Sequence, residues 1–318
     1  MHSYRSLIHV CVFILIVAVS FDYMDSPFEP KQMATFSDAV ESVAQNKDPL
    51  YNKIKHKSED YEEDPQNAVI DKVWKKMPGR NGVEVNLDES YEQMQDQDGF
   101  EDTLLVYDQI EPDVTMDDLP PAPVYRGHSD KDMVSLLINV AWGTEHIPAI
   151  LNTLKEHDVK ATFFIEGKWA KNNTDYVKMI EEQDHLIGNH AYNHPVMSRL
   201  SQEDILKQIN QTNDILEAIT GETPQLLAPP SGDYNNLVVE TAASQNMQTI
   251  LWSVDTVDWK NPSVSVMLNR VDRNIHPGAM LLMHPTASIA EGLDSLLKHI
   301  EEDGYRFGTV NTLLSSER

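Results

Sequence analysis

After residue 130, two patterns of apolar and polar positions alternate along the chain, one typical of buried strands and one typical of amphipathic helices. Residues 134–140 form a near-continuous apolar run, which is typical of a strand buried on both faces. The next apolar side chains, Ile147, Ile150, Leu151 and Leu154, are three or four residues apart and predict an amphipathic helix. The same alternation predicts further strands near 161–165, 186–189, 226–228, 247–253, 279–283 and 307–309, and helices at 169–180 and from about Ser201 onward.

The helix near Ser201 begins with an N-terminal signal. Ser201 precedes Asp204 in a Ser-x-x-Asp pattern that resembles a capping box, and Ile205 and Ile209 continue an apolar face behind it. Strands that alternate with helices on this scale imply parallel strands with right-handed crossovers. The expected fold class is therefore α/β, in a barrel or a doubly wound sheet, and in both the site forms at the carboxyl ends of the strands.

A separate apolar run occupies residues 7–20, just after Arg5. It is short for a membrane span, which needs ~20 apolar residues, and suits the apolar region of a signal peptide. The tripeptide Ala18-Val19-Ser20 is an acceptable cleavage site. We expect residues 1–20 to be a signal peptide or, as the alternative, a membrane anchor. Either places the remaining chain outside the cytoplasm and limits membrane contact to this segment.

The chain between this run and residue 130 predicts three short regions. Residues 21–66 are polar and acidic without a periodic apolar face, which indicates a mostly disordered spacer. Residues 67–117 predict a small accessory segment, because Ala68 and Trp74 belong to a run of helical spacing and residues 83–85 alternate like a strand. Residues 118–129 are proline-rich and predict a semi-rigid linker.

Composition excludes several classes of partner and chemistry. The chain has 51 acidic and 25 basic residues and a formal net charge of −26, which disfavours nucleic acid and anionic membranes as partners and tolerates a neutral or cationic polymer. Its one cysteine, Cys11, lies inside the apolar run. A processed chain would then have no disulfide, no thiol nucleophile and no thiolate metal site.

Side chains capable of chemistry gather where the predicted strands end. They lie in the segments 139–143, 188–195, 228–232, 255–260 and 281–285.

Each of these segments also permits a structural interpretation. His190 and His194 can share a metal ion, and they can equally be two surface histidines in a turn. Trp259 beside Asp258 can wall an apolar slot or can be a packed indole. His284 can be a general acid or a hydrogen-bonded structural histidine.

Together the five segments, in this order and spacing, resemble the NodB-type polysaccharide deacetylases, carbohydrate esterase family 4. The resemblance covers roughly residues 130–318 and rests on His-x-x-x-His, Pro-x-Gly, Asp-x-x-Asp-Trp and Leu-x-His. It implies a distorted parallel (β/α) barrel and a metal-assisted removal of acetyl groups from N-acetylglucosamine polymers. The implied cofactor is a divalent metal, usually zinc, and the implied partner is an N-acetylated glycan, peptidoglycan or chitin-like.

By the resemblance, the metal ligands lie in segment 188–195 and the oxyanion donor lies in segment 228–232. By the resemblance, His190 and His194 are two metal ligands. The backbone N–H of Ser231, after Pro230, is the donor that stabilises the oxyanion.

The remaining roles fall on the fourth and fifth segments. The resemblance makes Trp259 and Leu282 the walls of the slot for the acetyl methyl group. It makes His284 the general acid and Asp258 the residue that orients it and favours its protonated form.

The chain departs from the family at four positions. Two aspartates, the general base and the third metal ligand, are here Ala141 and Trp142. The arginine that holds the base is Ala228, and Ala191 replaces a hydroxyl residue that braces the histidine loop. Glu145 is the nearby carboxylate that would have to replace either aspartate, and we expect it to begin a helix and point elsewhere.

Two functions remain open on these grounds. The first is a deacetylase of cell-wall or related N-acetylated glycan with impaired activity, since loss of a general base removes about 10²–10⁴ in rate. The second is a non-catalytic protein on the same fold that binds glycan or acts as a scaffold.

Overall fold

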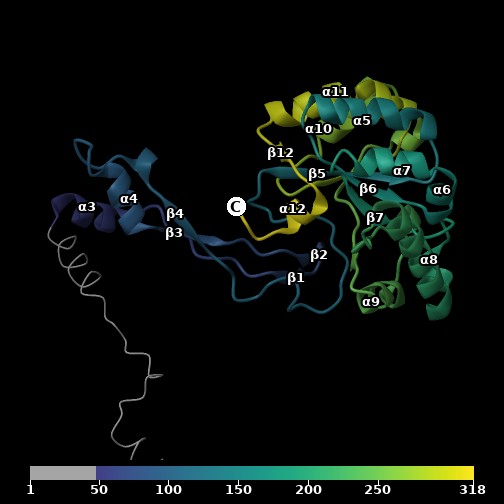
Figure 1. Ribbon diagram of the computed structural model, residues 1–318, viewed down its shortest axis with the longest axis horizontal. Coiled ribbons are helices and arrows are strands. Elements are labelled where there is room, and N and C mark those ends of the chain that lie inside the picture. Colours follow the sequence, from purple (N-terminus) through teal and green to yellow (C-terminus); the bar gives the residue numbers. More distant parts are fainter. Residues whose placement is uncertain (1–47) are drawn as a thin grey trace, which may run out of the picture. The chain divides into compact units, whose positions relative to one another are not determined.

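The computed structural model describes residues 48–318, so the expectations for the leader at 1–20 and for residues 21–47 lie outside the described part. The described chain divides into two compact units. The first contains residues 48–60 and 86–106, and the second contains Tyr61–Val85 and Tyr107–Arg318 (Figure 1). None of the helices in residues 48–318 has the length and apolarity needed to cross a membrane.

The second unit is built on a curled parallel sheet. Its strands lie side by side in the order β10 (Val254–Asp255), β11 (Met280–Met283), β5 (Met133–Val140), β6 (Thr162–Ile165), β7 (Leu186–Asn189), β8 (Leu226–Leu227) and β9 (Gln248–Thr249), and β12 (Arg306–Phe307) pairs with β5. All of these pairs are parallel. This confirms the α/β fold with a parallel barrel-type sheet that the sequence predicts.

Strand β5 shows how the apolar run forms the centre of the sheet. All eight of its residues are buried. Val134, Leu136 and Val140 point to the cluster that packs against the outer helices, whereas Leu137 belongs to the cluster inside the sheet. Because side chains alternate between the two faces of a strand, burial on both faces requires a continuous apolar sequence.

The strands are followed by amphipathic helices, as expected. They are α5 (Ile147–Glu156), α6 (Gly167–Asn172), α7 (Thr174–Glu181), α8 (Gln202–Thr220), α9 (Asn236–Ser244), α10 (Val264–Asp272), α11 (Ala287–Glu302) and α12 (Val310–Leu314). Ser201 caps α8 by accepting the N–H of Asp204 at 3.2 Å, which confirms the predicted N-cap, and the Asp204 carboxylate accepts the Ser201 hydroxyl at 2.7 Å instead of its backbone N–H. The helix predicted at 169–180 is instead two helices, because Asn173 has an extended φ of −136°.

The helix predicted from Ala68 to Trp74 is wrong. This stretch is a hairpin of β1 (Val69–Asp71) and β2 (Lys75–Met77). The Asp71 carboxylate accepts the N–H groups of Val73 and Trp74 at 2.7 and 2.8 Å, and this side-chain turn competes with helix formation. The strand predicted at 83–85 is confirmed as β3 (Gly82–Val85), which pairs with β4 (Tyr107–Ile110).

The first unit corrects the expectation of a disordered spacer over its described residues. Helix α3 (Pro49–Ser58) begins at Asp48, whose carboxylate accepts the N–H of Leu50 at 2.7 Å. It packs with α4 (Leu87–Met94), and the Tyr91 hydroxyl donates to Asp48 at 2.9 Å. Contacts from the accessory segment thus order residues that lack an apolar periodicity of their own.

The proline-rich stretch at 118–129 is not a free linker. Val124 is fully buried, and its backbone pairs with Ile250 directly after β9. Two residues on, Arg126 pairs with Ala279 directly before β11. This stretch therefore pairs with the chain after β9 and before β11 and belongs to the same unit as the sheet, so the boundary expected near residue 130 is absent.

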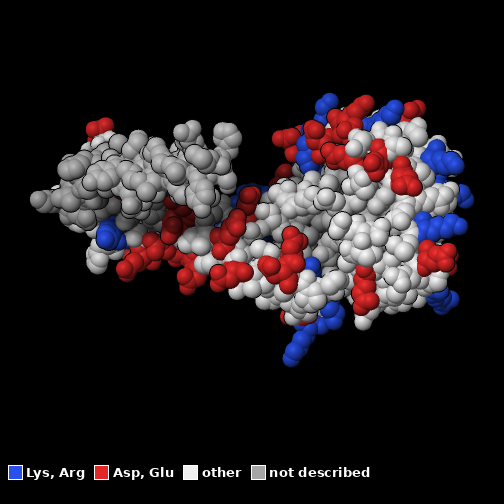
Figure 2. Space-filling model, turned by 60° about the horizontal axis from the view of Figure 1, so that its bottom comes forward, with Lys and Arg blue, Asp and Glu red and all other residues white. Residues whose placement is uncertain are grey.

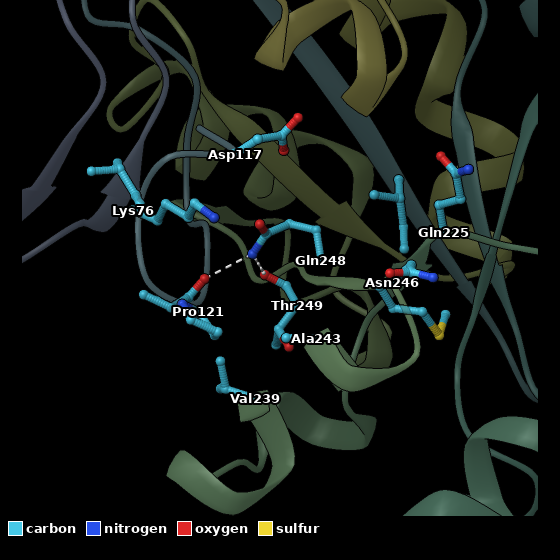
Figure 3. A pocket seen from close by; sticks show the side chains of 13 residues that line it. Lys76, Asp117, Pro121, Gln225, Val239, Ala243, Asn246, Gln248 and Thr249 are labelled. Atoms are coloured by element: carbon cyan, nitrogen blue, oxygen red, sulfur yellow. Dashed lines mark hydrogen bonds between the residues drawn. The ribbon is translucent and has the colours of Figure 1, made fainter. Parts of the chain in front are cut away.

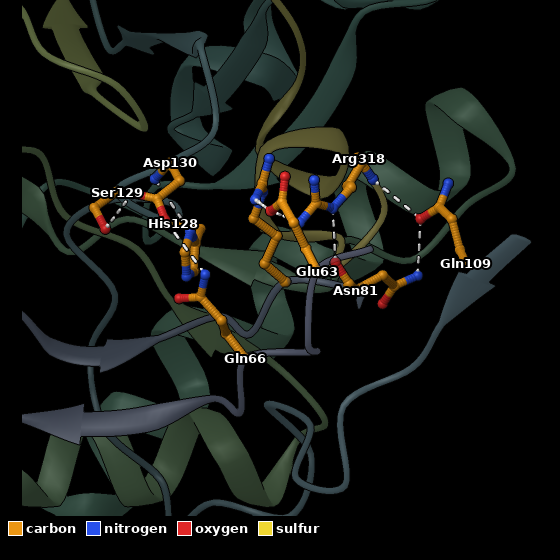
Figure 4. Close-up of polar contacts among 9 residues, drawn as sticks. Glu63, Gln66, Asn81, Gln109, His128, Ser129, Asp130 and Arg318 are labelled. Carbon is orange, nitrogen blue, oxygen red and sulfur yellow. Dashed lines mark hydrogen bonds and ion pairs between the residues drawn. The ribbon is translucent and has the colours of Figure 1, made fainter. Parts of the chain in front are cut away.

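Ion pairs connect the strands before residue 85 to the end of the chain (Figure 4). Arg318 pairs with Glu63, which also pairs with Arg80 at 3.1 Å, and Arg318 donates to the Asn81 carbonyl at 2.8 Å. The hydrogen bond from Arg318 and its charge lower the pKa of Glu63 to about 2. Residues 61–85 are in this way held to the same unit as the sheet.

The charge of the surface agrees with the composition. Figure 2 shows acidic side chains spread over the visible face, with basic side chains between and beside them.

Candidate functional site

A cleft of about 390 Å³ opens where the parallel strands end. Its lining comes from the carboxyl ends of β5, β7 and β11 and from the segments after β8 and β9: Asn139, Ala141, Trp142, His190, His194, Ser231, Trp252, Asp255, Trp259, Leu282 and His284. The sheet thus brings the five sequence segments together, as expected for a parallel α/β fold.

The histidine loop follows β7. His190 is 2% exposed, and its Nδ1 donates to the carbonyl of Ala228 at 2.7 Å, which leaves Nε2 as the nitrogen available to a ligand. His194 takes a positive φ of 54°, and its ring centre lies 5.2 Å from that of His190. Burial lowers the pKa of His190 to about 3, so this imidazole is neutral at neutral pH, as a metal ligand must be.

The donor atoms at this place do not complete a catalytic metal site. Among residues 48–318 there is no group of three or more His, Cys, Asp or Glu side chains that could hold an ion. Glu145 does not join the two histidines: its side chain is 76% exposed and lies 3.8 Å from His146. A catalytic zinc keeps three protein ligands, and only His190 and His194 are in place. No chemical step through a metal follows from this arrangement.

Two of the positions that depart from the family pattern, Ala141 and Trp142, line the cleft. Trp142 stacks on His284, with ring centres 5.9 Å apart and planes at 11°, and it remains 46% exposed. Ala228 is buried. The space where the family has two carboxylates and a guanidinium therefore holds one indole and small side chains.

His284 is held by a buried carboxylate. Its Nδ1 lies 3.1 Å from Asp258 Oδ1, and its backbone N–H donates to Oδ2 at 3.1 Å. Asp258 is fully buried and also accepts the hydroxyls of Thr256 and Thr286 at 2.8 and 2.9 Å. A carboxylate accepts hydrogen bonds only, so it fixes the ring proton on Nδ1 and leaves Nε2 on the cleft side.

The remaining predicted residues lie around the same opening, with one exception. Leu282 and Trp259 line it, and Trp259, in the middle of the short 3-10 turn η5 (Asp258–Lys260), is 49% exposed. Ser231 lines it at a positive φ of 56°. Pro230 is buried beside Ser231 and is not among the lining residues.

Three lining residues were not assigned roles from the sequence. Asn139 lies near the carboxyl end of β5, and its Oδ1 is buried without a hydrogen-bond partner in the described residues. Asp255 ends β10 and accepts the N–H of Val257 at 2.8 Å. Trp252 packs close to Gly232, and the strand alternation gave no sign of this contact.

We expect the purified protein to bind a divalent metal weakly and to lose it to a chelator. Two imidazoles supply fewer ligands than a stable zinc site needs. Elemental analysis before and after dialysis measures this, and His194→Ala is expected to remove the residual metal while Glu145→Ala leaves it unchanged. Stoichiometric zinc that survives dialysis and is lost in Glu145→Ala would contradict the prediction.

Comparisons with known proteins agree with this geometry. A family model described as polysaccharide deacetylase matches residues 126–250. An uncharacterized protein of Bacillus subtilis, YlxY, is 44% identical over 315 residues, 99% of each chain. A peptidoglycan-N-acetylglucosamine deacetylase of Bacillus cereus is 34% identical over 202 residues, which cover 62% of this chain and 74% of the relative.

Solved structures are similar over most of the described chain. A carbohydrate esterase family 4 pseudoenzyme from Bacillus anthracis has a TM-score of 0.81 at 48% identity, covering 85% of this chain and 96% of its own. A mutant of that pseudoenzyme, described as having restored enzymatic activity, has a TM-score of 0.81 at 46% identity, covering 85% and 100%.

Proposed function

The chain belongs to the polysaccharide deacetylase family, carbohydrate esterase family 4, and from this membership we propose that it acts on N-acetylated cell-wall glycan with an impaired hydrolytic step. The observation that carries the proposal is that the cleft keeps some of the residues that the family's chemistry needs and lacks others. Asp258 and His284 keep the geometry of an oriented acid, whereas Ala141, Trp142 and Ala228 stand where the base, the third ligand and the arginine belong.

The retained side chains can still bind and orient an N-acetyl group. In the proposal, Trp259 and Leu282 hold the acetyl methyl group, and the Ser231 N–H points to the amide oxygen. His284 Nε2 carries the proton for the departing amine, and Asp258 stabilises that protonated ring.

The step that fails is the activation of water. No carboxylate stands at 141 to take its proton, and we expect a divalent ion, zinc by family resemblance, to be held only weakly by His190 and His194. Loss of the general base alone removes about 10²–10⁴ in rate. The family has an arginine at the position of Ala228. Its absence agrees with the absence of a carboxylate at 141, because a buried arginine without a carboxylate partner is destabilising.

A non-catalytic glycan-binding role is the second candidate, and one observation favours it. Trp142 covers one face of His284 and adds an exposed indole to the cleft, where Trp259 offers another. Indole faces are common surfaces for ligands that have apolar faces and polar edges. The similarity to a pseudoenzyme of the same family supports this candidate.

We propose peptidoglycan as the glycan, because the relatives named above include a peptidoglycan-N-acetylglucosamine deacetylase. A cell-wall substrate requires a location outside the cytoplasm, in line with the leader expected at residues 1–20. Neutral glycan is also compatible with the acidic surface.

Acetate release from peptidoglycan and from acetylated chitooligosaccharide tests the proposal. The wild-type rate is expected to be far below that of the B. cereus relative assayed in parallel, and His284→Ala is expected to reduce what remains. A robust wild-type rate that His284→Ala abolishes would refute impaired catalysis.

A further inference from the structure

A second cavity lies at the opposite ends of the strands from the cleft. It has a volume of about 600 Å³, and its lining includes Gln225, just before β8, and Asn246, just before β9 (Figure 3). In a parallel sheet the amino and carboxyl ends of the strands are on opposite edges. This cavity is therefore separate from the candidate deacetylase site, and an inference about it is independent of the proposed function.

Lys76, in the middle of β2, points into this cavity (Figure 3). The residue is 6% exposed, and its backbone N–H donates to the Pro123 carbonyl at 3.1 Å, which fixes the strand against the 118–129 stretch. Within residues 48–318, no hydrogen bond or ion pair reaches its ammonium group. Burial lowers the pKa of Lys76 below its usual value, and the charge of Asp117 opposes this shift.

The cavity also holds an unpaired charge of the opposite sign. Asp117 is exposed, lines the cavity, and forms no ion pair with Lys76. Gln248 also lines the cavity, and its Nε2 donates to the Ala122 carbonyl at 2.7 Å (Figure 3). One cation and one anion separated in one cavity offer matched positions for a ligand that carries both charges.

The rest of the lining suits a small ligand with an aliphatic part. Apolar surface comes from Leu119, Pro121, Val239 and Met247, and amide groups come from Gln225, Asn246 and Gln248. Polar and apolar surface contribute about equally to this lining, so a small ligand with both polar groups and an aliphatic part fits it.

We propose that this cavity binds a small zwitterion, a free amino acid or dipeptide, with its carboxylate on Lys76 and its ammonium group on Asp117. The ligand supplies an acceptor for the Lys76 ammonium group, which lines the cavity and has no partner among the described residues. A ligand with a net charge of zero fits better than a simple anion, because Lys76 and Asp117 together are neutral.

Calorimetric titration of the full chain with L-alanyl-L-alanine tests this. Binding in the millimolar range or tighter is expected. The N-acetylated dipeptide, which lacks the cation, and the dipeptide amide, which lacks the anion, are each expected to bind at least ~10-fold more weakly, since each loses a charge-assisted contact. Two results would overturn the proposal. One is acetate that binds as well as the dipeptide, and the other is the absence of dipeptide binding at a concentration ~10-fold above the millimolar range.

Variants locate the binding. Lys76→Met is expected to remove it and Asp117→Asn to weaken it at least ~10-fold, whereas Lys72→Met, the same change on the exposed turn of the hairpin, leaves it intact. Without ligand, Lys76→Met is expected to raise Tm by ~2–4 °C, because it removes a desolvated charge. Dipeptide binding that persists in both Lys76→Met and Asp117→Asn would overturn the assignment. If Lys76→Met does not fold, Asp117→Asn and the two blocked dipeptides decide.

Discussion

Replacing Ala141 and Trp142 by aspartate and Ala228 by arginine in one variant is expected to raise acetate release by roughly 10²–10⁴-fold. The aspartate at 141 regains a general base, and the aspartate at 142 adds a third ligand to His190 and His194. The arginine at 228 places a charge beside the new base. Acetylated chitooligosaccharide is the substrate, and released acetate is the measured quantity.

The three changes are expected to act as a unit. Ala141→Asp alone is expected to do little, because the carboxylate then lacks both its cation and a bound ion. Ala228→Arg alone is expected to lower Tm, because position 228 is buried and a buried cation without a partner is destabilising. The similarity of this chain to a mutant pseudoenzyme described as having restored activity supports the design.

A control variant distinguishes regained catalysis from a contaminating deacetylase activity. His284→Ala in the triple variant is expected to return acetate release to the wild-type level, because Asp258 then has no acid to orient. The triple variant should also retain zinc after dialysis. A triple variant that folds and holds zinc but releases no more acetate than the wild type would contradict the assignment of the missing residues.

N-acetylated oligosaccharide is expected to change the tryptophan fluorescence of the wild-type protein, and Trp259→Ala is expected to weaken binding by at least ~10-fold. Exposed tryptophans at binding sites often cost more than 1 kcal/mol when truncated, and 1.4 kcal/mol is tenfold in affinity. Trp259 is half exposed at the cleft, with Lys260 over its ring at 4.7 Å, so its loss removes contact area and spares the core. Trp74→Ala, in the β1–β2 hairpin, is the control and should leave binding unchanged.

Trp142→Ala distinguishes the two roles of the second indole. If Trp142 provides a stacking surface, its removal weakens binding; if it fills the slot, its removal creates binding that the wild type lacks. Our expectation is the first result, because Trp142 remains 46% exposed while it covers His284. No binding at millimolar oligosaccharide by either protein would reject glycan recognition and leave a scaffold role with a protein partner.

The sequence by itself predicted the alternation of strands and helices after residue 130 and the place of the site, although the one strand predicted at 247–253 is the two strands β9 and β10. Burial on both faces requires the continuous apolar run of β5, and a local Ser-x-x-Asp contact starts α8, so both can be recognised from neighbouring residues. The parallel arrangement then brings the strand-end segments together, which is why His190 and His284 were found without coordinates.

Sequence patterns failed where distant contacts decide the structure. Nothing local in residues 118–129 reveals that Val124 pairs with Ile250 and is buried. The helical spacing around Trp74 does not produce a helix, because the Asp71 side chain forms a turn and the backbone of Lys75 pairs with Val124. Propensity is a weak prior that tertiary pairing overrides.

The tertiary structure also decided what the lost residues left behind. The resemblance places Trp142 where the family has a carboxylate, but a linear pattern does not give the direction of the indole, which stacks on His284 in the fold. Likewise, Lys76 is one lysine among several until the fold buries its stem and directs its ammonium group into a cavity. Side-chain direction depends on neighbours that come from remote parts of the chain, and a linear pattern does not contain them.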